Sequence, residues 1–195
     1  MLDFISQELN KTSAVVIAMK NDFELSEKIE KAARIVTSAL RNGKKILLAG
    51  NGGSAADSQH IAGEFVSRFY YDRPGLPAIA LTVDTSVLTA IGNDYGYERV
   101  FSRQVEALGC QGDIFWGYST SGRSPNILAA MKAAQGKGMT VIGMTGSKGW
   151  SDPSLCELTL AMPSTETPKI QEGHLIVGHI ICGLVEKEIF PRSAE

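Results

Sequence analysis

The chain has 195 residues, of which 44% are hydrophobic and 21% are charged, and its net charge is −2. This length suits one sizeable domain, and the composition is that of a globular protein rather than a disordered or fibrous one. Because basic residues are not in excess, the chain lacks the electrostatic footprint of nucleic-acid-binding proteins, and we expect no nucleic-acid partner.

The cysteines and the apolar stretches indicate a cytoplasmic protein. Cys110, Cys156 and Cys182 lie far apart and form no CxxC pair, which is typical of reduced thiols. The N-terminus carries an early acid and no basic segment, so it does not resemble a signal peptide. The longest apolar stretch, residues 175–185, is about half the length that spans a bilayer. We therefore expect no membrane partner.

Two amphipathic helices open the chain. Apolar residues recur near every third or fourth position in residues 1–20 and again in 24–41. Both helices precede any strand, so neither can connect two strands. An apolar stripe outside the main fold usually packs on a partner, and we expect residues 1–42 to be a helical extension used in oligomerisation. The alternative is that these helices cover the domain's own sheet.

Short apolar runs then alternate with helical segments. The runs predict strands at 46–49, 78–82, 113–118, 140–144 and 157–161, and the segments between and after them predict helices at 55–69, 85–92, 97–108, 125–135 and 168–188. This alternation is typical of β-α-β crossovers, so we expect an α/β fold with a doubly wound, five-stranded parallel sheet. No linker divides the chain, which predicts a single domain over residues 1–195.

Two Gly/Ser-rich loops follow predicted strands, and ligands bind at the carboxyl ends of parallel strands. In the loop at 119–124, Gly122 permits a tight turn, and Ser124-Pro125 is a strong helix start with Ser124 at the N-cap. Hydroxyl groups around a helix N-terminus form a phosphate cradle, whereas a plain capped turn needs only one of them. The loop supplies four, from Ser119, Thr120, Ser121 and Ser124.

The earlier loop, residues 50–55, contains Asn51, Gly52 and Gly53 and matches G-x-G-x-x-A, a weak dinucleotide fingerprint. It therefore suggests a rival class, a nucleotide-binding oxidoreductase. That class has an acid about 20 residues further on, after the second strand. Asp84 follows that strand but lies about 30 residues away. A dinucleotide-binding fold also does not need the second hydroxyl-rich loop. We therefore favour a sugar phosphate as the ligand.

Polar residues on two predicted helices are candidates for chemistry. His60 and Glu64 are four residues apart and share one helical face, which suits metal ligation or acid–base work but also a structural hydrogen bond. His179 lies in an apolar run, where a core histidine is the structural alternative. Gln171 precedes it by eight residues, about 12 Å along an ideal helix, so spacing alone does not establish a shared metal.

The residues quoted above also carry a family resemblance over nearly the whole chain. Residues 47–65, 88–96, 119–122 and 167–174 resemble the bacterial phosphoheptose isomerases of the sugar isomerase (SIS) domain superfamily, which has a flavodoxin-like sheet. These enzymes convert sedoheptulose 7-phosphate to D-glycero-D-manno-heptose 7-phosphate, the first step towards the ADP- and GDP-heptose precursors of lipopolysaccharide and related polysaccharides. The resemblance implies the same isomerase activity here.

The family's functional residues can be placed on matching positions. The resemblance implies one zinc ion per subunit, and it implies a homotetramer with active sites at subunit interfaces. It assigns the acid–base pair to Glu64 and His179 and the zinc ligands to His60, Glu64, Gln171 and His179. The implied substrate contacts are Asn51, Gly52, Gly53, Glu64, Asn93, Asp94, Ser119, Thr120, Ser121, Ser124 and Gln171.

Some positions depart from the family, and two other functions are compatible with the fold. Arg123 stands in the phosphate loop where relatives often have Asn or Lys, and it would either contact phosphate or face solvent. Lys169 is assigned no role. A non-catalytic SIS module, which binds a sugar phosphate or associates with a replication initiator, would not need both Glu64 and His179, so we favour the enzyme. An isomerase of another sugar phosphate stays open.

Overall fold

Five parallel strands form the centre of the molecule, in the order β2-β1-β3-β4-β5. In register, Leu48 lies opposite Ala80 on one side and Trp116 on the other. The strands are β1 (Ile46–Ala49), β2 (Ala78–Ala80), β3 (Ile114–Tyr118), β4 (Thr140–Gly146) and β5 (Leu158–Met162). This computed structural model describes residues 1–192. It confirms the predicted doubly wound parallel sheet and all five predicted strands.

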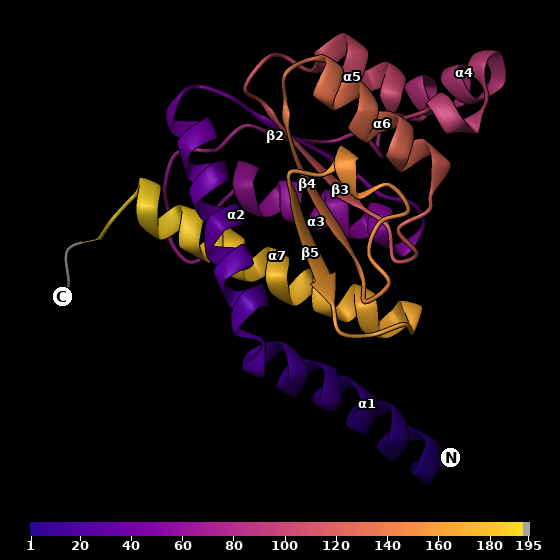
Figure 1. Cartoon of the computed structure of the whole chain (residues 1–195). Helices are drawn as coiled ribbons and strands as arrows, with labels where there is room; N and C mark the ends of the chain where they lie inside the picture. The colour runs from indigo at the N-terminus through magenta and orange to yellow at the C-terminus, as the bar shows by residue number, and fades with distance from the viewer. Residues whose placement is uncertain (193–195) are drawn as a thin grey trace.

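Helices cover both faces of the sheet (Figure 1). Successive residues of a strand point to opposite faces, so Ile46 and Leu48 join one hydrophobic cluster and Leu47 and Ala49 the other. The first cluster is closed by α2 (Phe23–Arg41), α3 (Gly53–Val66) and α7 (Thr167–Ile189). The second is closed by α5 (Ser102–Leu108) and α6 (Pro125–Gly136).

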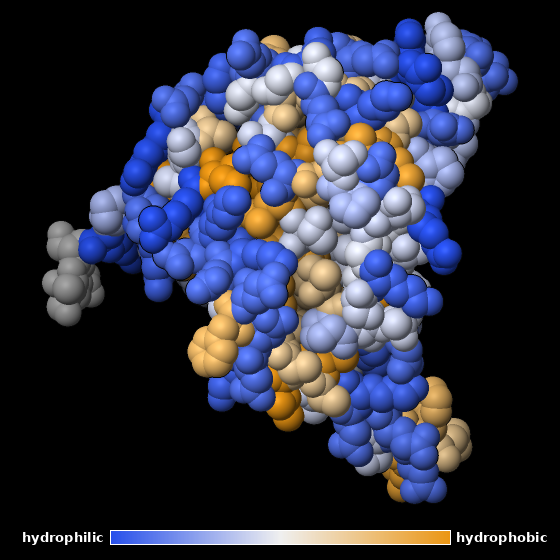
Figure 2. All heavy atoms as spheres, in the orientation of Figure 1, coloured by the Kyte–Doolittle hydropathy of each residue, from blue (hydrophilic) through white to orange (hydrophobic). Residues whose placement is uncertain are grey.

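The two leading helices differ in their packing. Leu25, Ile29 and Val36 of α2 are buried in the first cluster, so α2 covers the domain's own sheet. In contrast, α1 (Leu2–Asn21) projects from the body, and Met19 is its one buried residue (Figure 1). Apolar side chains lie exposed along it (Figure 2), among them Leu2, Phe4, Ile5, Leu9 and Ile17.

The remaining elements lie at the margin of the second face. The helix predicted at 97–108 is divided into a 3-10 turn, η1 (Tyr97–Arg99), and α5. Before them, α4 (Thr85–Tyr95) buries none of its residues, and a second 3-10 turn, η2 (Pro153–Leu155), precedes β5. None of the helices within residues 1–192 combines the length and the apolar character that crossing a membrane requires. All three cysteines are free thiols.

Candidate active site

The first Gly/Ser loop is joined to the start of α6, the helix that follows the second loop, at the carboxyl edge of the sheet. The amides of Asn51 and Asn126 form a reciprocal pair, with N–O distances of 2.9 and 2.8 Å. The Tyr97 hydroxyl donates a third hydrogen bond to Oδ1 of Asn51, at 3.2 Å. Gly52, which precedes α3, has φ +57°, a conformation that glycine adopts without strain. The loops therefore form one continuous surface rather than two independent sites.

Three of the four hydroxyl groups of the second loop, those of the serines, point toward one another. Oγ of Ser119 lies 2.8 Å from Oγ of Ser124 and 3.5 Å from Oγ of Ser121. Ser124 occupies the N-cap position of α6, as predicted, but its hydroxyl makes no capping hydrogen bond because it faces Ser119 instead. The backbone carbonyl of Ser124 accepts from the N–H groups of Ile127 and Leu128, at 3.1 and 3.0 Å, and Pro125 has no N–H. The N–H of Asn126 is left without a partner among the described residues, which favours an anion at this helix end.

A polar pocket of about 200 Å³ opens beside this loop. Thr120 and Ser121 line it together with the exposed cations Arg123 and Lys148. Neither cation forms an ion pair with any acid within residues 1–192. Arg123 therefore lies exposed on the rim of the pocket, a position that is compatible with both alternatives, contact with phosphate and exposure to solvent.

Two histidines and a carboxylate from α3 and α7 converge beside the loops. Nε2 of His60 lies 2.7 Å from Nε2 of His179 and 3.2 Å from Oε1 of Glu64. One ligand atom from each of the three residues lies within 4.8 Å of the others. Imidazole nitrogens and a carboxylate oxygen are the donors that Zn²⁺ prefers, so these residues fit a divalent metal. The helix spacing correctly indicated that His60 and Glu64 share a face.

The local electrostatics favour a neutral imidazole at this cluster. Burial lowers the pKa of His179, and the proximity of His60 lowers it further, although Glu64 acts in the opposite direction. A neutral imidazole keeps a lone pair for a metal or a proton. One turn before His60, burial raises the pKa of Asp57 to about 6. Oδ2 of Asp57 has no hydrogen-bond partner within residues 1–192.

Helices α3 and α7 run side by side in the same direction. As a result, Gln171 near the start of α7 lies next to the start of α3. A Cβ added to Gly53, at the start of α3, would lie 2.6 Å from Nε2 of Gln171. Eight residues further along α7, His179 meets His60. Gln171 therefore lies against the first loop, about 12 Å along the helix from His179.

Asn93 and Asp94 lie apart from these groups, exposed near the end of α4. Nδ2 of Asn93 donates to Oδ1 of Asp94 at 2.8 Å. Asp94 also lines an apolar cavity of about 570 Å³ with Tyr95 and Arg103, between α4, α5 and β2. Within one chain, these two proposed substrate contacts do not join the loops or the histidine cluster by any hydrogen bond of the described residues.

Sequence reasoning did not identify several residues that organise the site. Asn126 was detectable in principle, because it directly follows the Ser124-Pro125 helix start. Lys169, to which no role was assigned, ties α7 to α1 through Oγ1 of Thr12, at 2.8 Å. Trp116 and Trp150 are buried core residues, and Trp150 also lines a small pocket beside the second loop with Ser121, Arg123 and Lys148.

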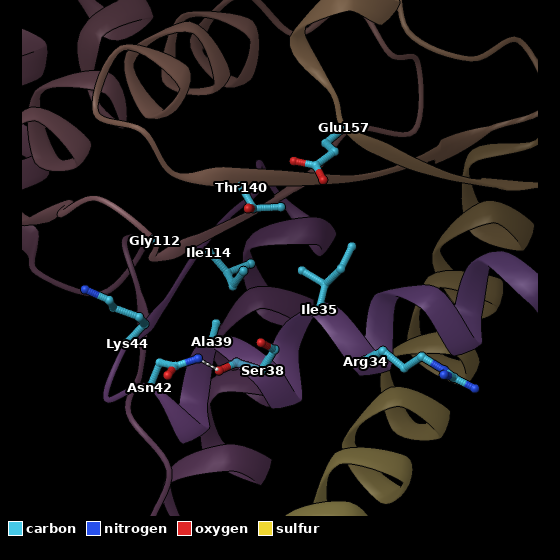
Figure 3. Close-up of a pocket in the computed structure, with 10 residues that line it drawn as sticks. All are labelled: Arg34, Ile35, Ser38, Ala39, Asn42, Lys44, Gly112, Ile114, Thr140 and Glu157. Atoms are coloured by element: carbon cyan, nitrogen blue, oxygen red, sulfur yellow. Dashed lines mark hydrogen bonds between the residues drawn. The ribbon is translucent and has the colours of Figure 1, made fainter.

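A further cavity, of about 720 Å³, lies at the opposite, amino-terminal edge of the sheet (Figure 3). Figure 3 shows Ile114 and Thr140 at this edge, near residues of α2, whereas the side chain of Lys44 points away from that helix. Within it, Nδ2 of Asn42 donates to the carbonyl oxygen of Ser38 at 2.8 Å. The cavity is remote from the Gly/Ser loops and the histidine cluster, and it contains none of the candidate site residues.

Comparisons with known proteins agree with this arrangement. The SIS domain model matches residues 11–146. A phosphoheptose isomerase of Burkholderia pseudomallei is 60% identical over 192 residues, which are 98% of each chain. Solved structures of phosphoheptose isomerases from Francisella tularensis and Neisseria gonorrhoeae have TM-scores of 0.91 and 0.89 and identities of 37% and 39%. Each alignment covers 95% of this chain and 98% of the other.

A hydroxyl-rich loop at the carboxyl edge of a parallel sheet, matched by the domain model over most of the chain, defines a SIS domain protein. Within that superfamily, the near full-length relatives at 60% identity are more specific. The chain belongs to the phosphoheptose isomerase family, as the motifs of its loops and helices predicted.

Proposed function

We propose that this protein is an isomerase that converts sedoheptulose 7-phosphate to D-glycero-D-manno-heptose 7-phosphate. The observation that carries the proposal is the convergence of His60, Glu64 and His179 at a site that also has a hydroxyl-rich loop. His60 lies seven residues along α3 from Gly53, about 10 Å by helical rise. This separation leaves room for the sugar chain between the first loop and the histidine cluster.

The loop at 119–124 would hold the phosphate. Its clustered hydroxyls and the open N-terminus of α6 supply donors, and Arg123 supplies a charge at the rim. Binding energy from the phosphate would orient the open-chain sugar for reaction. The first loop would contact the sugar through Asn51, Gly52 and Gly53, and Gln171 lies next to it.

The reaction moves a proton between adjacent carbons and another between their oxygens, through a cis-enediol. We assign the carbon-bound proton to Glu64 as the base. Its Oε1 faces His60, which leaves Oε2 for the transfer. We assign the oxygen-bound proton to His179, because an imidazole that binds a metal through one ring nitrogen keeps the other nitrogen to hold and return a proton.

We propose zinc as the metal, held by His60, Glu64 and His179, with Gln171 as a fourth ligand. Zinc bound there would act as a Lewis acid on the oxygens of the substrate. Because Gln171 and His179 are about 12 Å apart along α7, a shared ion requires their side chains to converge or the ligands to come from two subunits.

We further propose a homotetramer with active sites at subunit interfaces, in the cytoplasm. Residues 1–195 would form one SIS domain, with 1–42 as its helical extension. The exposed apolar side chains of α1 and the lack of buried residues in α4 support contacts with other subunits. Such contacts would also bring Asn93 and Asp94 of one chain to the site of another, where they are proposed to bind substrate.

The proposed substrate is tested by supplying purified protein with sedoheptulose 7-phosphate, with unphosphorylated sedoheptulose, and with ketose phosphates of five and six carbons. We expect aldose formation to be fastest from sedoheptulose 7-phosphate and to be almost absent without the phosphate. A preference for a shorter sugar phosphate would support the isomerase activity but contradict sedoheptulose 7-phosphate as the substrate. The absence of aldose from every compound would favour a non-catalytic binding module.

A further inference from the structure

The segment that follows α3, residues 67–74, is held between α3 and α7 by a buried ion pair. The side chains of Arg73 and Glu186 are 3% and 0% exposed, and Nε of Arg73 lies 3.0 Å from Oε1 of Glu186. Glu186 lies on α7 seven residues, or two helical turns, after His179. The ion pair therefore lies directly beyond the histidine cluster along both helices.

Arg73 closes the C-terminal end of α3. One of its terminal nitrogens donates to the carbonyl oxygen of Glu64, at 2.8 Å. The other donates to the carbonyl oxygens of Phe65, Ser67 and Pro74, at 2.7, 3.2 and 3.0 Å. The last carbonyls of a helix have no partner inside the helix, and a cation near them is favourable. The guanidinium thereby fixes the backbone of the residue whose carboxylate faces His60.

Glu186 fixes the other side of the cluster. Its two carboxylate oxygens accept hydrogen bonds from the backbone N–H groups of Phe69 and Tyr70, at 2.8 and 2.7 Å. The ring of Phe69 consequently packs against the imidazole of His179, with 5.5 Å between the ring centroids. Tyr70 packs on Gly183, where an added Cβ would lie 2.8 Å from Cε2 of the tyrosine.

We propose that Arg73 and Glu186 are a positioning pair that holds Glu64 and His179 in register, with Phe69 as the contact to the imidazole. This inference rests on the proposed function for its catalytic readout. A buried ion pair usually adds little stability compared with well-packed apolar residues, so stability alone does not account for it. The pair instead fixes the positions of three parts of the site relative to one another. These are the end of α3, the segment 67–74 and the face of α7 that carries His179.

Three variants separate positioning from simple structural support. Glu186→Gln removes the charge but keeps the shape, Arg73→Lys keeps the charge but loses the fork of donors, and Phe69→Leu removes only the ring that contacts His179. Glu188→Gln is the matched control, because Glu188 is exposed and lies two residues further along α7. For each protein, we would measure the thermal midpoint, the zinc affinity of the metal-free form by calorimetric titration, and kcat and KM with sedoheptulose 7-phosphate.

We expect Glu186→Gln and Arg73→Lys to bind zinc about tenfold or more weakly and to lose about tenfold or more in kcat, with KM changed little, as for other residues that orient metal ligands. Phe69→Leu should show the same pattern with a near-normal thermal midpoint, and Glu188→Gln should match the wild type. Folded Glu186→Gln and Phe69→Leu proteins with wild-type zinc affinity and kcat would overturn the proposal.

The proposal can still be tested if a variant does not fold or if the wild type is inactive. If Glu186→Gln does not fold, Phe69→Leu decides, because Phe69 contributes only a backbone N–H to the ion pair. If the wild type binds zinc but does not isomerise the sugar, the proposed function fails. In that case, zinc affinity alone decides whether the pair positions the cluster.

Discussion

The Nε2 atoms of His60 and His179 lie 2.7 Å apart, although the two residues are separated by 119 positions in the chain. Two imidazole nitrogens at this distance require a proton between them, because their lone pairs otherwise repel. The contact exists because α3 and α7 run side by side in the same direction on one face of the sheet. It brings the proposed base, Glu64, to the same place.

Glu64→Gln should separate chemistry from binding. The amide keeps the size of the side chain but cannot accept the carbon-bound proton. We therefore expect kcat to fall by about 10²–10⁴-fold while KM changes little. Steady-state kinetics with sedoheptulose 7-phosphate measure both values, and a kcat near that of the wild type would remove Glu64 from its proposed role.

His60→Ala should weaken the metal site. Loss of one imidazole leaves two of the three converging ligands, so we expect the zinc affinity to fall by about tenfold or more, with activity recovered only at excess zinc. Metal analysis after dialysis and a zinc titration check this. Cys110→Ser is the control, because Cys110 is an exposed free thiol outside the cluster. If only the cysteine variant lost zinc, the metal would be bound elsewhere.

Gly122→Ala should distort the phosphate loop. Gly122 has φ +64°, and an added Cβ would collide with the carbonyl oxygen of Gly149. We expect a loss of about 1–3 kcal/mol in the free energy of unfolding and a higher KM. Gly136→Ala at the end of α6 is the matched control, because no atom lies within 4 Å of its added Cβ. Equal free energies of unfolding for both variants in urea would contradict the expected strain at Gly122.

Arg123→Asn tests the cation at the rim of the phosphate pocket. Because Arg123 is exposed, its attraction to phosphate is worth only about 1 kcal/mol, which corresponds to about a fivefold increase in KM. The difference should shrink at high salt because ions screen the charge. Lys137→Gln, an exposed cation at the other end of α6, should have no such effect. An unchanged KM at low salt would place Arg123 in solvent.

Asp113→Asn should alter stability in a pH-dependent way. Burial raises the pKa of Asp113, but hydrogen bonds from the side chain and backbone of Lys45 and the backbone of Cys110 outweigh burial and lower it below its ordinary 3.8. The carboxylate therefore stabilises the fold above that pH, and the contribution disappears as the pH falls through the lowered pKa.

At neutral pH, we expect Asp113→Asn to lower the free energy of unfolding by about 2 kcal/mol. Below pH 3.8 the difference from the wild type should diminish. Unfolding in urea at several pH values measures it, with Glu27→Gln, which removes an exposed acid from α2, as the control. A constant difference down to the lowest pH at which the protein folds would show that the charge of Asp113 is not responsible.

Local patterns in the sequence were sufficient for the fold. Alternating apolar runs and helical periods predicted every strand and its neighbouring helices, since a sheet buried on both faces requires them. The leading helices were harder, because apolar residues recur in both, although they are confined more strictly to one face in α2, which is the helix that packs on the sheet. Whether an amphipathic face meets its own domain or another chain depends on tertiary contacts that periodicity does not contain.

The candidate site was predictable where its residues form local motifs. The Gly/Ser loops and the spacing of His60 and Glu64 are of this kind, and the family resemblance supplied the roles of two further candidates, Gln171 and His179. The pairing of Asn51 with Asn126 and of Arg73 with Glu186 was not predictable, because these partners are 75 and 113 positions apart. Single charged or amide residues give no local signal of a distant partner.

The most direct test of the isomerase is to follow sedoheptulose 7-phosphate by NMR in deuterated water with the purified wild type and with Glu64→Gln. We expect the wild type to form the heptose 7-phosphate aldose with deuterium at the carbon next to the aldehyde, because the enediol takes its proton from a base that exchanges with solvent. Glu64→Gln should form almost none. No aldose from the wild type, or equal formation by both proteins, would contradict the proposed chemistry.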